Sequence, residues 1–226
     1  MSTRADWQQH LLAAVDKALA AADGLADRRV AALRRANPTI TPGQLITALE
    51  REFTVAVTAT GSGTGLVAAV PAVGLPAAVG VAGADLVTFL TAAAAHTLAV
   101  ARIHGAPVTN VEHQRALVLA VLLGNAGTKV VMNSAGHLGV RWGQAIAATL
   151  PLRIIREVNV ALGGLLLKKF GPKAGVVTVA KATPLGLGAV IGGASNLVLA
   201  REVVRSARAA FGEAPATFIQ GESGQA

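Results

Sequence analysis

Hydrophobic side chains recur every three or four residues along most of this chain, which is the spacing of one buried face of an α-helix. Residues 1–36 show the pattern twice, before and after Gly24, so two amphipathic helices are expected there. Asn37-Pro38 ends the pattern, because the residue before a proline avoids helical backbone angles.

The next helix has a well-marked start. Thr41 suits the N-cap, Pro42 the first helical position, and Gln44 the position whose side chain returns to the cap. This helix is expected to run to about residue 58. Its buried stripe is predicted to comprise Leu45, Leu49, Glu52 and Ala56.

Glu52 is the charged member of this stripe, whereas Glu50 and Arg51 are expected to point away from it. An unpaired buried carboxylate costs several kcal/mol, so Glu52 needs a partner. Two interpretations are open. Glu52 forms a structural pair with an arginine or asparagine of another helix, or it is a polar group in a ligand cavity.

Residues 59–103 contain two formal charges, Asp85 and Arg102, so their apolar surface must be covered by a helical core or by lipid. The uncharged run 59–84 is interrupted by two prolines and is not a continuous membrane span of about 20 residues. Residues 182–200 are a second borderline candidate. Asp85 is expected to open the following helix as its N-cap, and His96 is expected to lie inside that helix.

Three further helical regions follow. They are residues 112–124, residues 151–170 and residues 173–211, the last interrupted at 184–188. In the second region the inward-facing residues are predicted to be Ile154, Val158, Ala161 and Leu165.

Together these patterns predict an all-α protein, a single compact bundle of about seven to eight helices with glycine-rich, closely packed central helices. Residues 63–68 imitate the GxGxxA of a dinucleotide-binding turn, but they continue a capped helix, and no alternation of strands and helices follows. The expected parts are N-terminal amphipathic helices (1–36), a helical domain (41–212) and a disordered tail (213–226).

Composition moves the expectation toward a membrane. Hydrophobic residues make up 53% of the chain and charged residues 14%, against about 25% charged in ordinary soluble domains. The chain has no cysteine, and its first twenty residues lack the continuous apolar core of a signal peptide. The expected location is the cytoplasmic side of a membrane, either peripheral or partly inserted.

The net charge of +8 is unevenly distributed, because residues 141–181 supply +6 of it. Few aromatic residues and no nucleic-acid-binding motif argue against nucleic acid as the partner. Either this segment faces an anionic membrane surface or lipid, or it is a solvated helix face. Its basic residues are Arg141, Arg153, Arg156, Lys168, Lys169, Lys173 and Lys181.

No catalytic motif, cofactor site or metal site is predicted, since the five histidines lack metal-binding spacing. His96 is expected to be a core histidine with a hydrogen-bond partner, or, if an apolar ligand cavity exists, to face Glu52 across it. The polar candidates for lining such a cavity are Glu52, Asp85, His96, Asn125, Lys129 and Asn196.

Residues 41–212 resemble the EcsC-like family of bacterial proteins, in particular an actinobacterial branch. The resemblance rests on ALEREF, the glycine-rich apolar stretch, ARIHG, EHQRALVLAVLLG and, most strongly, the pattern PxGxGAVIGGxxN between Pro184 and Asn196, followed by Arg201. It implies an all-α, membrane-associated protein without an established activity. Relatives carry an acidic residue after a Gly-Tyr at the end of the central helix, where this chain has Gly105-Ala106-Pro107.

Two functional hypotheses follow. The first is a non-enzymatic, membrane-associated protein that binds lipid or a membrane protein partner. The second is a soluble carrier or enzyme for a hydrophobic ligand, which would bind in the apolar cavity lined by the polar candidates named above.

Overall fold

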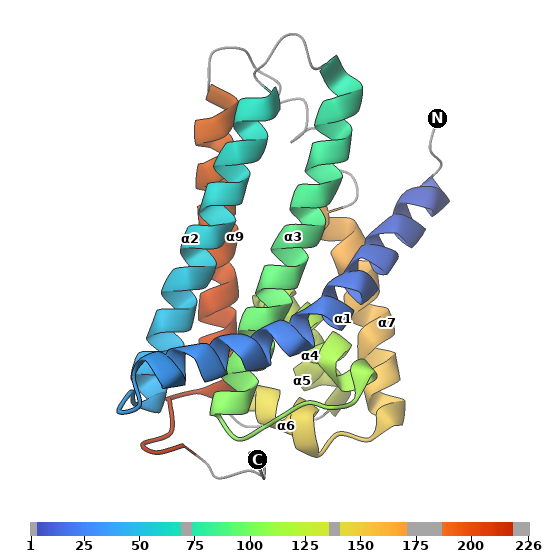
Figure 1. The fold of residues 1–226 in the computed structure, drawn as a ribbon. Helices are drawn as coiled ribbons and strands as arrows, with labels where there is room; N and C mark the ends of the chain where they lie inside the picture. Colours follow the sequence, from blue (N-terminus) through green and yellow to red (C-terminus); the bar gives the residue numbers. More distant parts are fainter. Residues whose placement is uncertain (1–3, 69–73, 136–140, 171–186, 219–226) are drawn as a thin grey trace.

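A computed structural model describes residues 4–68, 74–135, 141–170 and 187–218, and within them the side chains of residues 11–59, 86–134, 141–168 and 196–218. The described residues form eight α-helices and no strand, which confirms the predicted all-α bundle (Figure 1). The helices are α1 (Arg4–Ala36), α2 (Pro42–Ala68), α3 (Gly74–Ile103), α4 (Val111–Leu123), α5 (Asn125–Ala135), α6 (Trp142–Ala148), α7 (Leu152–Phe170) and α9 (Leu187–Phe211).

Three long helices form the upright part of the molecule. α2 packs along α9 and against α3, and the three extend past the other helices at one end, the top in Figure 1. The end of α2, the start of α3 and the start of α9 all lie at this end of the molecule. The opposite halves of these helices belong to the body of the protein.

The body is built around α4, which packs against α7, α5 and α3. Gln114 and all residues of α4 from Ala116 to Leu123 are buried. The turn into α5 uses Gly124 at φ 62°, a left-handed conformation that glycine adopts without strain. Gly127 then lies so close to α4 that an added Cβ would come within 2.3 Å of the Ala120 carbonyl oxygen. The α4–α5 contact therefore requires glycine at this position.

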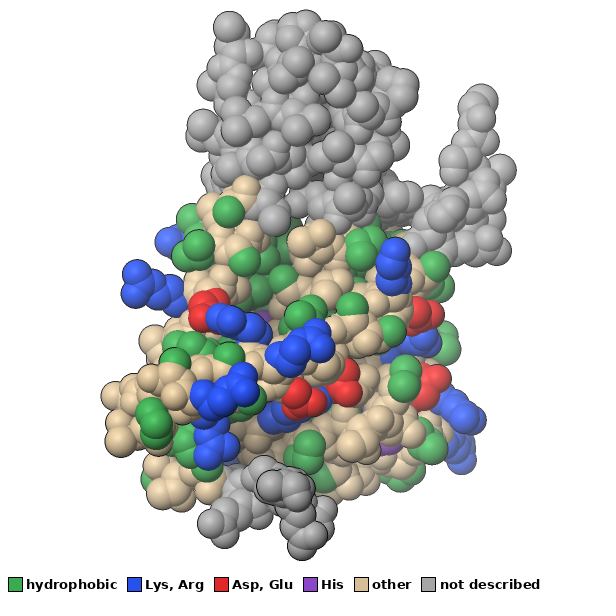
Figure 2. Space-filling view, in the orientation of Figure 1, with side chains coloured by type: hydrophobic (Ala, Val, Ile, Leu, Met, Phe, Trp, Pro, Cys, Tyr) green, Lys and Arg blue, Asp and Glu red, His purple; other side chains and the backbone are tan. Residues whose placement is uncertain are grey.

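α1 crosses the bundle diagonally and packs against α3 (Figure 1). Its buried stripe is aliphatic, and ion pairs flank it. Arg102 of α3 lies 2.5 Å from Asp23 and 2.6 Å from Asp27, and Arg115 of α4 pairs with Asp16. Acidic and basic side chains accordingly intermingle where α1 crosses this face (Figure 2). α1 is held by both apolar burial and charge.

Local signals placed several helix ends correctly. α1 ends at Ala36, immediately before Asn37-Pro38. The predicted capping box at the start of α2 is present, because the Gln44 amide donates to the Thr41 hydroxyl oxygen at 3.3 Å and the Thr41 amide donates to the Gln44 side chain at 3.0 Å.

Other predicted boundaries were wrong. α1 is a single helix that continues through Gly24, because its packing against α3 outweighs the roughly 1 kcal/mol preference against glycine. α2 continues ten residues beyond 58, to Ala68. α3 begins at Gly74, so Asp85 lies inside a helix and is not an N-cap. The Asn- and Gly-rich residues 125–135 form α5, which was not predicted as a helix.

The predicted buried face of α7 was partly wrong. Val158 is fully buried, but Ala161 is exposed, and the other fully buried positions are Ile155, Leu162 and Leu166. The face is displaced because α7 contacts α4 and α5 together, and Asn159 donates to the Glu112 carbonyl oxygen of α4 at 3.0 Å.

The start of the predicted disordered tail is also different. Residues 213–218 follow α9 without helical structure, and Phe218 packs against the core with the Arg34 guanidinium 4.3 Å from its ring centre. Residues 219–226 lie outside the described residues.

Candidate functional site

The three helix ends that extend beyond the body carry no formal charge. α2 has no charged residue after Glu52, α3 has none before Asp85, and α9 has none before Arg201. We call residues 53–68, 74–84 and 187–200 the charge-free ends. At about 1.5 Å per residue they measure roughly 16 to 24 Å along their axes.

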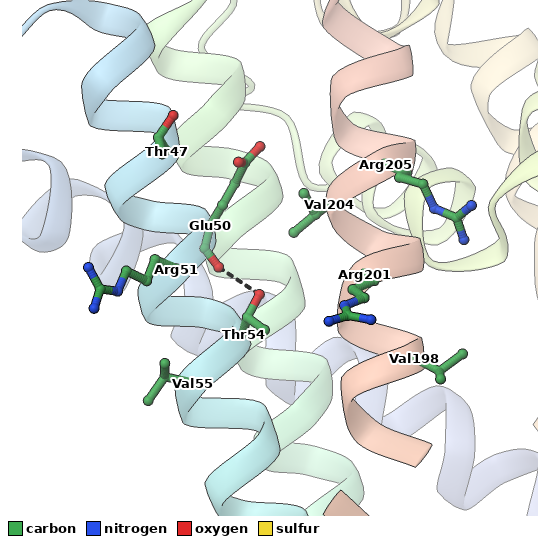
Figure 3. A pocket seen from close by; sticks show the side chains of 9 residues that line it. All are labelled: Thr47, Glu50, Arg51, Thr54, Val55, Val198, Arg201, Val204 and Arg205. Atoms are coloured by element: carbon green, nitrogen blue, oxygen red, sulfur yellow. Dashed lines mark hydrogen bonds between the residues drawn. The ribbon is translucent and has the colours of Figure 1, made fainter. Parts of the chain in front are cut away.

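An open groove lies between α2 and α9 at the base of these ends, with a volume of about 770 Å³. Figure 3 shows Glu50, Thr54 and Val204 between the two helices, with Arg51 and Val55 on the α2 side and Arg205 and Val198 on the α9 side. Arg201 lies between Arg205 and Val198 on α9. We call this the α2–α9 groove; its lining is Thr47, Glu50, Arg51, Thr54, Val55, Val198, Arg201, Val204 and Arg205.

Glu50 is the acidic residue of the groove. Its carboxylate is mostly buried and accepts two bonds from Arg208 of α9, from Nε at 2.7 Å and from Nη2 at 2.5 Å. This two-point geometry is the strongest form of an arginine–carboxylate pair. The hydrogen bonds from Arg208 and the charge of Glu50 raise the pKa of Arg208. The pair joins α2 to α9 and neutralises Glu50.

The remaining three charged residues of the groove are arginines. Arg51, Arg201 and Arg205 are exposed and form no ion pair with any described residue. Val55 and Val198, which are 61% and 62% exposed, belong to the charge-free ends and lie about one helical turn from Arg51 and Arg201. The groove therefore combines positive charge with apolar surface.

His96 lies in the core, stacked on Phe53 of α2 with ring centres 5.0 Å apart. Neither ring nitrogen has a hydrogen-bond partner in the described part of the chain. Burial lowers the pKa of His96 to about 4; the charge of Glu50 opposes this effect and that of Arg208 adds to it. His96 is thus a neutral core residue behind the Glu50–Arg208 pair.

The structure does not bring the predicted cavity residues together. Glu52 is partly exposed and pairs with Arg29 of α1, so it forms the pair with an arginine of another helix that the first interpretation predicted, and it does not face His96. Asn196 is buried and donates to the Val57 carbonyl oxygen at 3.1 Å, which ties α9 to α2. Asn125 and Lys129 are exposed on α5. The side chain of Asp85 lies outside the described residues.

The described basic residues of the 141–181 segment, Arg141, Arg153, Arg156 and Lys168, do not gather at one end of the molecule. Arg141 lies beside Gly212, after the end of α9 that is remote from the charge-free ends. Arg153 and Lys168 sit at opposite ends of α7, separated by about 22 Å of helix rise. Arg156 is exposed on the same helix. The side chain of Lys169, and Lys173 and Lys181 altogether, lie outside the described residues.

Sequence reasoning missed the groove because it assigned the wrong side of α2 to the interior. The buried stripe runs through Leu45, Leu49, Phe53 and Val57, which places Glu50 beside it and next to α9. A usable signal was present in α9, where Arg201, Arg205 and Arg208 follow at intervals of four and three residues and so share one side of the helix.

One segment among the described helices is long and apolar enough to cross a membrane. It is Leu86–Ile103 of α3, with a mean hydropathy of 1.6, and 61% of it is buried inside the protein. A core helix of a soluble protein has the same properties, so this segment does not decide the location. The described residues contain no group of three or more His, Asp or Glu side chains arranged to hold a metal ion.

Comparison of the chain with models of known protein families, with curated proteins and with solved structures gave no match.

Proposed function

We propose that this chain is a non-enzymatic, membrane-associated protein whose charge-free ends enter one leaflet of a bilayer from the cytoplasmic side. The observation that carries the proposal is that three uncharged helix ends lie at the same end of the molecule and extend beyond its body (Figure 1). Leaving a sequence of this apolar composition in water would cost about 25 cal/mol for each Å² of exposed apolar surface, and contact with lipid would avoid that cost.

The lengths of these ends support entry into one leaflet. Half of a bilayer measures about 15 Å through its hydrocarbon and about 20 to 22 Å with its head groups. The charge-free ends measure roughly 16 to 24 Å by the helical rise, and their inner turns, which include Phe53, Val57 and Ala200, are buried in the body. The outer turns are therefore long enough to enter one leaflet and too short to cross two. Helical backbone is suited to that environment because its hydrogen bonds are internal.

The exposed valines of α2 and α9 support the same orientation. Val55 and Val198 present apolar surface at the level where the charge-free ends leave the body. The resemblance to the EcsC-like family predicts the same class of function. A ligand cavity has less support, because Glu52 is engaged by Arg29 and His96 is packed on Phe53.

Single cysteines provide a direct test, because the native chain has none to compete for a label. Leu66→Cys and Val190→Cys place a fluorescent label on the charge-free ends, and Val111→Cys, at the exposed start of α4, serves as the control. We expect vesicles of mixed phosphatidylglycerol and phosphatidylcholine to shift the emission of the first two labels to the blue and to leave the third unchanged.

Quenchers placed at different depths in the lipid distinguish the modes of insertion. Entry into one leaflet predicts that the label at position 66 is quenched within the near leaflet and is inaccessible from the far side of the vesicle. Unchanged emission at positions 66 and 190 would refute membrane insertion. Accessibility from the far side would instead show a spanning segment.

A further inference from the structure

We infer that the α2–α9 groove binds the phosphate of an anionic glycerolipid while the charge-free ends are in the membrane. This inference rests on the proposed function and names the lipid class and the residues that select it. Arg201 would contact the phosphate. Arg51 and Arg205, whose side chains extend away from each other on the outer sides of α2 and α9 (Figure 3), would add positive charge at the two edges of the groove, and Val55 and Val198 would contact the first part of an acyl chain.

The charges of the groove fit an anion. Arg208 already neutralises the groove carboxylate, Glu50, through two short bonds. The three other arginines have no acidic partner among the described residues, which leaves the groove with a net charge of about +3. Guanidinium groups match phosphate oxygens with two parallel donors and are more weakly hydrated than ammonium groups.

The position of the groove fits the level of lipid head groups. Arg51 and Arg201 mark where the charge-free sequence begins on each helix. Arg51 immediately precedes Glu52, the last charged residue of α2, and Arg201 is the first charged residue of α9. From Arg51 to the end of α2, and from the start of α9 to Arg201, the helices rise about 21 to 26 Å. That rise matches the thickness of one leaflet with its head groups.

The shape of the groove also favours a lipid of the surrounding membrane. The groove is open to the outside of the protein, so a lipid can enter it laterally without leaving the bilayer. Its apolar contribution comes from Val55 and Val198, which belong to the charge-free ends, where the acyl chains would be. If the grooves of two copies of the chain faced each other, each would have to supply acidic groups to the three arginines of the other. The described lining of the groove contains one acidic residue, Glu50, which already pairs with Arg208.

The test compares two charge-matched variants in full-length protein. Arg201→Gln/Arg205→Gln removes two charges from the groove, and Arg153→Gln/Arg156→Gln removes two exposed charges from α7. Partition is measured on vesicles of phosphatidylcholine alone and on vesicles containing phosphatidylglycerol. We expect the preference of the native protein for anionic vesicles to fall about tenfold in the groove variant and less than threefold in the α7 variant.

The outcomes separate the two proposals. If the label at position 66 still enters the membrane but the two variants lose anionic preference equally, the groove does not select lipid and the inference is overturned, whereas the proposed function stands. If no label enters the membrane, the proposed function itself fails. Displacement of the protein by millimolar inorganic phosphate at constant ionic strength would assign the groove to a free anion. A lipid-free dimer that the groove variant dissociates would assign it to a second copy.

Discussion

α4 and the charge-free ends have similar composition but different surroundings. The residues of α4 from Ala116 to Leu123 are uncharged, and neighbouring helices bury all of them. The charge-free ends are equally free of charge, yet they extend beyond the helices that cover the body (Figure 1). Apolar composition therefore has two uses in this molecule. In the body it forms a protein core, and at the charge-free ends we propose that lipid completes the burial.

α3 contains both situations in one helix. Its segment Leu86–Ile103 satisfies the length and hydropathy of a membrane span but lies largely inside the protein. The preceding turns, 74–84, belong to the charge-free ends. A hydropathy profile cannot distinguish the two parts, because the difference lies in which other helices are adjacent.

The largest effect that distinguishes these regions is expected from truncating a core side chain. Leu117 of α4 is fully buried, so Leu117→Ala should lower the free energy of unfolding by about 2 to 5 kcal/mol, measured by urea denaturation followed by circular dichroism. Val198→Ala, at a 62% exposed position, should change it by less than about 0.5 kcal/mol in the absence of lipid. Similar losses for both variants would contradict the distinction between core and exposed apolar surface.

The second effect concerns His96 of α3, which is buried against Phe53 of α2 inside the body of the protein. Because its pKa is about 4 in the folded protein and about 6.5 when unfolded, the unfolded state binds the proton first as the pH falls. The free energy of unfolding of the native protein should therefore be constant with respect to His96 above about pH 6.5. It should fall by about 3 kcal/mol between pH 6.5 and pH 4. His96→Leu should flatten that part of the pH profile of unfolding free energy. Parallel profiles for the two proteins would show that His96 is not buried as a neutral group.

The smallest effect separates the two sides of α2. Glu50→Gln weakens the two-point pair with the half-exposed Arg208 and should cost about 1 to 2 kcal/mol. Glu52→Gln weakens a more exposed pair with Arg29 and should cost less than about 1 kcal/mol. Thermal and urea denaturation of both variants gives the comparison. A greater loss for Glu52→Gln would restore the sequence-based assignment of Glu52 to the interior.

The sequence predicted those features that short segments specify. The capping box of Thr41 and Gln44 and the helix end before Asn37-Pro38 each involve residues within a few positions of one another. The all-α class follows from helical periodicity repeated along the chain. These parts of the fold could be predicted because no distant partner decides them.

The candidate groove could not be predicted, because its residues come from helices far apart in the chain. Glu50 meets Arg208 across 158 positions, and Glu52 meets Arg29 across 23 positions. α2 contacts α9, α3 and α1, so several of its sides are covered, and a search for one buried stripe selects the wrong carboxylate. The same cause displaced the predicted buried face of α7, which two helices cover jointly.

The ion pairs of α1 also bear on the order in which the chain can fold. α1 is synthesised before its partners, since Asp23 awaits Arg102, 79 positions later, and Asp16 awaits Arg115, 99 positions later. Contacts this distant in sequence form slowly because a long loop must close first. The aliphatic stripe of α1, which includes Leu11, Val15 and Leu19, therefore stays uncovered until α3 and α4 have emerged from the ribosome. During that interval the stripe is exposed apolar surface of the kind that makes folding intermediates prone to aggregate.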